Sequence, residues 1–253
     1  MRVILALMLL MMAALPGRAE EIVSGMSTTR VAIDAQFEGT SILIYGTAAR
    51  EEKPPSWPLL QVIVTVEGPV QPVTVRRKER VAGIWVNRGW VAFDDAPSFY
   101  AVMTTGQLDE ILSEEEDARF GVSIPREIGG VRLGAGSGMA GEYLEALQRI
   151  RGADGTYRLA PNSILLLQQS LFRTEVSLPA NLIEGEYTVR IFLTRGGAVV
   201  DMQESKITVA KAGLERFLYR MAMDQPLLYG VIALLLAALA GLAASELFRR
   251  LRL

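Results

Sequence analysis

The 253-residue sequence contains no cysteine and no histidine, and these two absences exclude several classes of functional site. Without cysteine there is no disulfide bond, no thiolate nucleophile and no sulfur ligand for a metal. Without histidine the chain lacks the commonest general base and the commonest zinc ligand. Ser-His catalysis, Cys-His catalysis and histidine-bound zinc are therefore excluded, and we expect no metal.

Lysine is scarce, and none of the lysines stands in the S-x-x-K spacing of a serine–lysine catalytic pair. Acidic residues are common but are poorly arranged for chemistry. Asp94 and Asp95 would need a partner carboxylate at a fixed distance for glycoside hydrolysis. The consecutive acids Glu114–Asp117 would point around a helix rather than at one ion. We predict no catalytic residue and no enzyme activity, and a carboxylate-based hydrolase is the remaining enzymatic alternative.

Residues 136–141 read Gly-Ser-Gly-Met-Ala-Gly and fit the G-x-G-x-x-G pattern of dinucleotide-binding loops. Such a site also needs a buried strand before the loop and an acidic residue about 20 positions after it. Val131-Arg132-Leu133 is a poor strand, and Asp154 comes too early. We interpret the segment as a loop before a helix and expect no bound cofactor.

The N-terminal residues have the three parts of a secretory signal. Arg2 is the basic start, Val3–Leu15 form an uncharged run, and the small residues Gly17 and Ala19 mark a cleavage site. The run is shorter than the ~20 residues that cross a bilayer as a helix. We predict that residues 1–19 are a signal peptide, and the alternative is an uncleaved anchor.

A second uncharged run, Leu227–Ala244, would span ~27 Å as a helix. It predicts one transmembrane helix at 226–246, followed by a basic cytoplasmic tail at 247–253. Three cations precede the helix and three follow it, so the positive-inside rule does not choose an orientation. The predicted signal does choose one, because an exported body must leave the residues after the helix inside the cell.

The region between the two ends is acidic. Residues 20–210 carry 18 basic and 25 acidic side chains, a net charge of −7 that argues against nucleic acid as a partner. Residues 211–225 have an apolar face interrupted by cations. They predict an amphipathic helix that either lies on the membrane surface or packs on the body.

Alternation of apolar and polar residues predicts strands in the first and last thirds of the exported region. The predicted strand segments are 31–33, 42–45, 60–66, 73–80, 84–86, 90–93, 164–167, 174–178, 187–193 and 199–209. Asn87-Arg88-Gly89 is expected to form a hairpin turn. Acidic and amphipathic helical patterns between these blocks predict a helical insert at about 105–155.

The segment Gly185–Ile191 contains Gly-x-Tyr-x-Val after a turn and then alternates as a strand. This pattern resembles the tyrosine corner of immunoglobulin-like sandwiches, and Val189 stands where a disulfide-bearing domain has its second cysteine. We predict a mainly β fold, an exported immunoglobulin-like β-sandwich over residues 20–210 with one C-terminal transmembrane helix. The alternative is an ordinary antiparallel hairpin with a surface tyrosine.

One predicted strand is unusually basic. If it is regular, Arg76, Lys78 and Arg80 point to one side, and Trp85 and Trp90 follow in the sequence. Three cations on one face beside aromatic side chains are a candidate binding site for an anion or a lipid phosphate. The alternative is an edge strand whose charges prevent aggregation.

Residues 73–87 and 97–102 resemble the signature of a transmembrane protein family of alphaproteobacteria, Alph_Pro_TM. The resemblance in architecture covers nearly the whole chain: a signal, an exported body and one C-terminal helix. The family has no established activity, so the resemblance implies no catalytic residue. Because genes of this family stand near permeases of the sulfite-exporter type, it implies such a permease as a candidate partner.

Small residues also recur along the predicted membrane helix. Ala233, Ala237, Gly241 and Ala244 follow one another at spacings of four, four and three and form one stripe. Small residues let helices approach closely in lipid. The stripe is a candidate interface with a second copy or with a polytopic partner such as a transporter, and the alternative is a simple anchor.

These observations predict a non-enzymatic, membrane-anchored periplasmic accessory or interaction protein. Its candidate partner is a permease of the sulfite-exporter type. The alternative function is a periplasmic anion- or lipid-binding module that uses the basic strand.

Overall fold

A computed structural model describes residues 20–34, 37–50, 53, 55–134, 139–211 and 221–251. The predicted signal peptide at 1–19 and most of the predicted helix at 211–225 lie outside these residues. The chain divides into two compact units. The first contains Phe37–Val209 and the N-terminal residues up to Val31, and we call it the body. The second contains Ala32–Gln36 and Ala210–Leu253.

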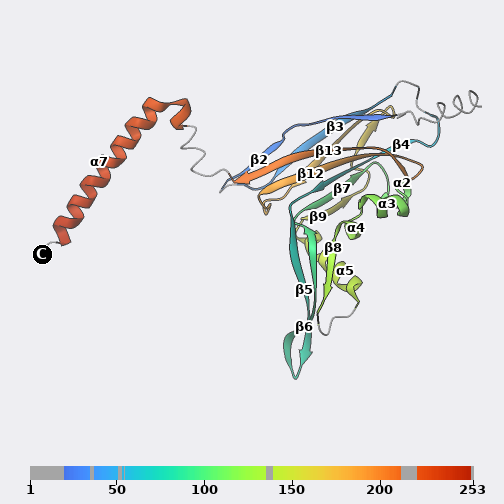
Figure 1. Cartoon of the computed structure of the whole chain (residues 1–253), viewed down its shortest axis with the longest axis horizontal. Helices are drawn as coiled ribbons and strands as arrows, with labels where there is room; N and C mark the ends of the chain where they lie inside the picture. Colours follow the sequence, from blue (N-terminus) through green and yellow to red (C-terminus); the bar gives the residue numbers. More distant parts are fainter. Residues whose placement is uncertain are drawn as a thin grey trace, which may run out of the picture. The chain divides into compact units, whose positions relative to one another are not determined.

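The described part of the body is mainly β, as predicted, and its strands form three sheets (Figure 1). A four-stranded sheet has the order β1 (Glu21–Met26), β3 (Thr40–Ala49), β11 (Leu171–Leu178), β10 (Leu165–Leu167). A six-stranded sheet has the order β2 (Arg30–Ile33), β13 (Ala198–Lys211), β12 (Gly185–Arg195), β4 (Leu60–Glu67), β7 (Tyr100–Thr104), β9 (Tyr157–Ala160). A three-stranded sheet has the order β5 (Val70–Val81), β6 (Ile84–Pro97), β8 (Gly129–Leu133).

The burial of the strands shows which sheet is central. Strands β3 and β11 bury every second residue, so one face of the four-stranded sheet is covered and the other faces solvent. Strand β7 is buried along its whole length and β4 nearly so, which means that both faces of the six-stranded sheet are covered there. On one face a cavity lined by Met103 and Val176 lies between β7 and β11. On the other face Ile63 and Phe192 pack with residues of β5, β6 and the helices.

Tyr187, at the start of β12, makes the hydrogen bond that characterises a tyrosine corner. Its buried hydroxyl donates to the carbonyl of Ile183, four residues upstream, at 2.9 Å. Val189, on the same strand, is fully buried. The local geometry agrees with the predicted corner, and the assignment of the whole body as an immunoglobulin-like sandwich stays a prediction.

Within the described residues of the body, the helices fall where the sequence predicts a helical insert. They are α2 (Leu108–Ile111), α3 (Glu114–Phe120), α4 (Ile124–Glu127) and α5 (Ala140–Ala153). The prediction that residues 131–133 do not form a strand is wrong, because β8 pairs there with β6. Strand β8 is exposed and antiparallel to β6, which differs from the buried parallel strand that a dinucleotide site requires.

The hairpin turn between β5 and β6 lies at Ala82-Gly83 and not at the predicted Asn87-Arg88-Gly89. Val81 pairs with Ile84, and both residues between them have positive φ angles, 50° at Ala82 and 89° at Gly83. Two positive φ angles in a two-residue loop define the type I′ turn, whose twist fits a hairpin. Residues 87–89 continue β6, so β5 and β6 form one long hairpin that projects from the body (Figure 1).

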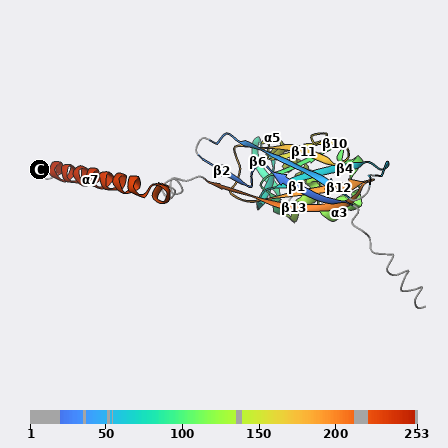
Figure 2. The same cartoon turned by 90° about the horizontal axis from the view of Figure 1, so that it is seen from above.

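In the second unit, Pro226–Leu251 form one continuous helix, α7 (Figure 2). Among the described residues it is the one helix long and apolar enough to cross a membrane, with a mean hydropathy of 2.4 over Pro226–Ser245. The predicted span at 226–246 lies within it. The helix also includes residues 247–251 of the predicted tail.

Candidate functional site

The five predicted binding residues lie on β5 and β6, but not at one place. The pairing of β5 with β6 shifts register between Arg76 and Lys78, so β5 is not the regular strand that simple alternation assumes. Arg76 and Lys78 line a groove against α5. Arg80 of β5 instead pairs with Trp85 of β6 close to the turn. Trp90 of β6 pairs with Arg76 of β5, farther from the turn. The structure therefore divides the predicted site into a groove and a hairpin tip.

The groove between β5 and α5, which we call the basic groove, has a volume of about 330 Å³. It is lined from β5 by Val75, Arg76, Arg77 and Lys78 and from α5 by Glu142, Tyr143, Ala146, Arg149 and Ile150. The α5 residues recur at intervals of three and four, which places them on one face of the helix. Tyr143 and Leu147 are buried in the core on one side of this helix, and the adjoining flank with Glu142 and Arg149 forms one wall of the groove.

Most of the positive charge in the basic groove has no counterion among the described residues. Arg77 forms an ion pair with Glu142 at 2.9 Å, and its guanidinium lies 6.0 Å from the centre of the Tyr143 ring. Arg76, Lys78 and Arg149 have no ion-pair partner in the described part of the chain. The groove therefore carries a local excess of positive charge, although residues 20–210 as a whole are acidic.

Apolar side chains surround the turn at the end of the β5–β6 hairpin. Ile84 is 65% exposed and Trp85 is 68% exposed, and Val81 beside them is also exposed. Arg80 and Arg88 add exposed cations. We call Val81, Ile84 and Trp85 with these two arginines the hairpin tip. A projecting tip that combines tryptophan, isoleucine and arginine is typical of a contact surface, because these side chains bury large areas when a partner covers them.

Trp90 differs from Trp85 because it is packed within the three-stranded sheet. Its indole ring lies against the backbone of Gly134, where an added Cβ would come within 2.1 Å of the ring. The Gly134 N–H also donates to the Trp90 carbonyl at 2.9 Å. Any side chain at position 134 would displace the indole, so Trp90 holds the end of β8 on β6.

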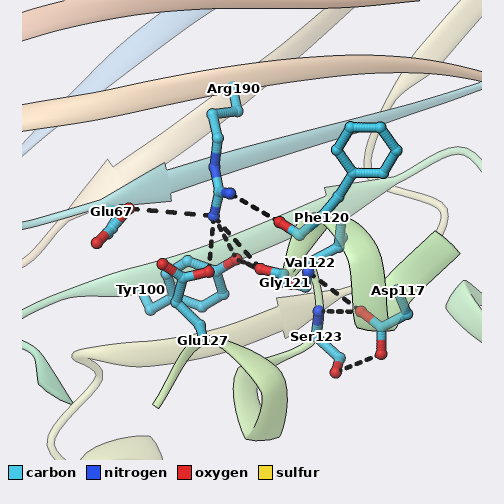
Figure 3. A network of polar contacts seen from close by, with 9 residues as sticks. All are labelled: Glu67, Tyr100, Asp117, Phe120, Gly121, Val122, Ser123, Glu127 and Arg190. Carbon is cyan, nitrogen blue, oxygen red and sulfur yellow. Dashed lines mark hydrogen bonds and ion pairs between the residues drawn. The ribbon is translucent and has the colours of Figure 1, made fainter. Parts of the chain in front are cut away.

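A buried ion cluster that the sequence does not reveal lies on the face of the six-stranded sheet that carries the helices (Figure 3). Arg190 of β12 donates to the Glu127 carboxylate at 2.8 Å and to the Phe120 carbonyl at 2.9 Å. It also donates to the Tyr100 hydroxyl at 3.3 Å and lies 4.0 Å from the Glu67 carboxylate. These contacts join β12, β4 and β7 to the loops and helices of the insert.

The two carboxylates of this cluster cannot both ionise easily. Burial, together with the negative charge of Glu127, raises the pKa of Glu67 to about 7, and the Arg190 guanidinium only partly opposes this rise. Burial also raises the pKa of Tyr100, whose hydroxyl donates to the Val122 carbonyl at 2.9 Å. Below about pH 7 the Glu67 carboxyl is therefore protonated in the folded protein.

The acidic run at 114–117, expected to be solvated, has two residues that bind backbone groups of the body. Asp117 accepts hydrogen bonds from the N–H groups of Val122 and Ser123 and from the Ser123 hydroxyl, at 2.7–3.1 Å. Glu116 accepts one from the Val199 N–H at 3.0 Å. These two half-buried carboxylates stabilise the loop after α3 and its contact with β13, whereas Glu114 and Glu115 face solvent.

Asp94, one of the two carboxylates considered for hydrolysis, forms an ion pair with Arg132 across the β6–β8 pair. Its neighbour Asp95 pairs with Gly129 in the register of the same two strands. Successive residues of a strand point to opposite faces. Asp95 therefore points away from Asp94 and does not supply the second carboxylate that a hydrolase site would need.

The stripe of Ala233, Ala237, Gly241 and Ala244 lies on α7. These four positions are exposed, as is most of the described helix surface. Their role as an interface stays a prediction.

A family described as "Putative transmembrane protein (Alph_Pro_TM)" matches residues 21–250. No curated protein sequence matches the chain.

Proposed function

The chain belongs to this Alph_Pro_TM family of transmembrane proteins, and on that premise we propose that it is a single-pass membrane-anchored interaction protein without enzymatic activity. Its body lies in the periplasm, α7 crosses the inner membrane, and residues 247–253 lie in the cytoplasm. Through the hairpin tip it acts as an accessory subunit of a larger membrane protein. The resemblance noted above suggests a permease of the sulfite-exporter type as the first partner to test.

The observation that supports this proposal best is the exposure of Ile84 and Trp85 at the end of a projecting hairpin. Large apolar side chains in water are unfavourable by about 25 cal/mol for each Å² that a partner could cover. The type I′ turn fixes them in one geometry, which lowers the entropy lost on binding. An element of this shape fits an apolar pocket in a partner.

The charges around the tip are of both signs, which suits a protein pocket. Arg80 and Arg88 would attract an anionic bilayer, but Glu79 lies between Lys78 and Arg80 on the same hairpin and would be repelled by it. A protein pocket with both acidic and basic groups at its rim can satisfy all of these charges. The anchor α7 keeps the body near other membrane proteins and raises their effective concentration.

Photocross-linking in cells tests the partner. We expect a benzoyl-phenylalanine at position 85 of the full chain to form a protein adduct, and Ile84→Ser to reduce its yield. The control position is Leu171, which is 52% exposed on the four-stranded sheet. Equal adduct yields at positions 85 and 171, or no adduct at position 85, would contradict the proposal. If position 85 cross-linked only to labelled phospholipid, the hairpin tip would contact the bilayer and not a protein.

A separate experiment tests the orientation. Alkaline phosphatase fused after Val209 should be active, because the enzyme folds only outside the cytoplasm, and the same enzyme fused after Leu253 should be inactive. The reverse pattern would place the body in the cytoplasm. It would remove the periplasmic part of the proposal without affecting the hairpin test.

A further inference from the structure

The basic groove differs from the hairpin tip in every property that decides what it can bind. The tip projects and exposes large apolar side chains beside two arginines, whereas the groove is a concave site of about 330 Å³ between β5 and α5. That volume is at the lower end of the range of about 300–1,000 Å³ that small-molecule sites occupy. The groove therefore has the size for a small ligand and not for a second protein chain.

The charges of the groove select the sign of that ligand. Arg76 and Lys78 from β5 and Arg149 from α5 line the same cavity, and no described carboxylate pairs with any of them. Arg77 and Glu142, which also line it, neutralise each other at 2.9 Å. Three cations that share one cavity repel one another, and a bound anion would remove that repulsion.

The surroundings of the groove restrict the anion to a small one. Residues 20–210 have a net charge of −7, so an extended polyanion would be repelled by the rest of the body. Arginine presents several N–H donors in a plane and binds the oxygens of phosphate or sulfate two at a time. Val75, Ala146 and Ile150 give the groove an apolar wall that can contact a short carbon chain next to the charged group.

We propose that the basic groove binds a small tetrahedral oxyanion, a phosphate or sulfate group, either free or carried by a small organic molecule or lipid headgroup. Arg76, Lys78 and Arg149 bind the oxygen atoms, and the Arg77–Glu142 pair fixes the distance between β5 and α5. This site is independent of the hairpin tip, because none of Val81, Ile84 and Trp85 lines the groove.

The test measures binding of three probes to the full chain in a non-ionic detergent: inorganic phosphate, sulfate and short-chain phosphatidylglycerol. We expect at least one of them to bind by calorimetry. Arg76→Gln with Arg149→Gln should weaken that binding about tenfold or more, since each cation contributes charge-assisted hydrogen bonds. The control variant Arg80→Gln with Arg88→Gln also removes two positive charges, but from the part of the β5–β6 hairpin outside the groove. It should change the affinity by less than about twofold.

Each outcome decides one point. Binding of none of the probes at millimolar concentration, or equal weakening by both double variants, would overturn the proposal. Preference for phosphatidylglycerol would identify a lipid headgroup as the source of the oxyanion, and preference for phosphate or sulfate would identify the free ion.

Because Arg76 and Arg149 are exposed, the groove variant should keep a cooperative unfolding transition, which shows that it folds. Ile84→Ser should leave the affinity unchanged, so a failed cross-link at position 85 does not affect this test.

Discussion

Two regions of the body that contain arginine differ in what faces their cations. In the buried cluster, one arginine, Arg190, meets two carboxylates, one hydroxyl and backbone carbonyls. In the basic groove, four cations face one carboxylate. In the buried cluster, acceptor groups outnumber the single cation, and their contacts hold the fold together. In the basic groove, the cations outnumber the carboxylates, so an anionic ligand can bind there.

The comparison shows that the number of arginines does not identify a binding site. A buried guanidinium must have partners in the folded chain, because an unpaired buried charge costs several kcal/mol. An exposed guanidinium has water as its partner and stays available. What distinguishes the two regions is therefore burial together with the count of acceptors, and four measurements test this distinction.

The largest effect is expected from Arg190→Met. The substitution leaves Glu127 and Glu67 buried without their cation, and we expect the free energy of unfolding to fall by about 3 kcal/mol. Urea unfolding of the full chain followed by tryptophan fluorescence measures it. Lys206→Met breaks the exposed Lys206–Glu186 pair and should cost less than about 0.5 kcal/mol. Equal effects of the two variants would show that the buried cluster is not structural.

The second effect is a pH dependence that Glu67 produces. Its pKa is raised from 4.5 to about 7 in the folded state, so between these values the native protein holds a proton that the unfolded chain has lost. This contribution is complete below pH 4.5 and disappears as the pH rises through 7, and it amounts to at most about 3 kcal/mol.

Glu67→Gln mimics the protonated side chain and should remove this pH dependence. We expect the variant to match the wild type near pH 5 and to be more stable at pH 8. Unfolding curves at both pH values measure the difference, and Glu186→Gln at an exposed position is the control. A variant that is destabilised equally at both pH values would contradict the assignment.

The third measurement concerns the hairpin tip, where we expect substitutions to leave the stability of the fold almost unchanged. Trp85→Ser and Ile84→Ser should each change the free energy of unfolding by less than about 0.5 kcal/mol, because both side chains already face water. Ile63→Val, at a fully buried position, should cost about 0.5–1.5 kcal/mol. A loss above 1 kcal/mol at the tip would mean that its side chains support the fold and are not kept for a partner.

The smallest effect should have the opposite sign. Arg76→Gln with Arg149→Gln relieves repulsion among unpaired cations, so the ligand-free protein should become more stable by a few tenths of a kcal/mol. The same urea unfolding, performed at low salt where repulsion is strongest, measures it. Destabilisation of more than about 1 kcal/mol would place these arginines with Arg190 as structural residues.

The sequence was informative where the signal is local. Alternation over a few residues predicted most of the strands, and an acidic pattern together with an amphipathic one predicted the helical insert. The hairpin turn was missed because Asn87-Arg88-Gly89 has better turn residues than Ala82-Gly83, yet the register of β5 with β6 places the turn at the latter. Strand β8 was missed because its exposed residues do not alternate, and it forms through its pairing with β6.

The sequence by itself determined the properties that depend on composition and short-range pattern: the absence of cysteine and histidine chemistry, the mainly β body and the apolar helix that a bilayer requires. The tertiary structure decided which charges meet. Arg190 and Glu127 are 63 residues apart, and Arg77 and Glu142 are 65 apart. No periodicity relates residues at such separations, because their contact depends on how whole sheets and helices pack. For this reason the basic strand was visible in the sequence, while its division into a groove and a tip, and the buried cluster beside it, were not.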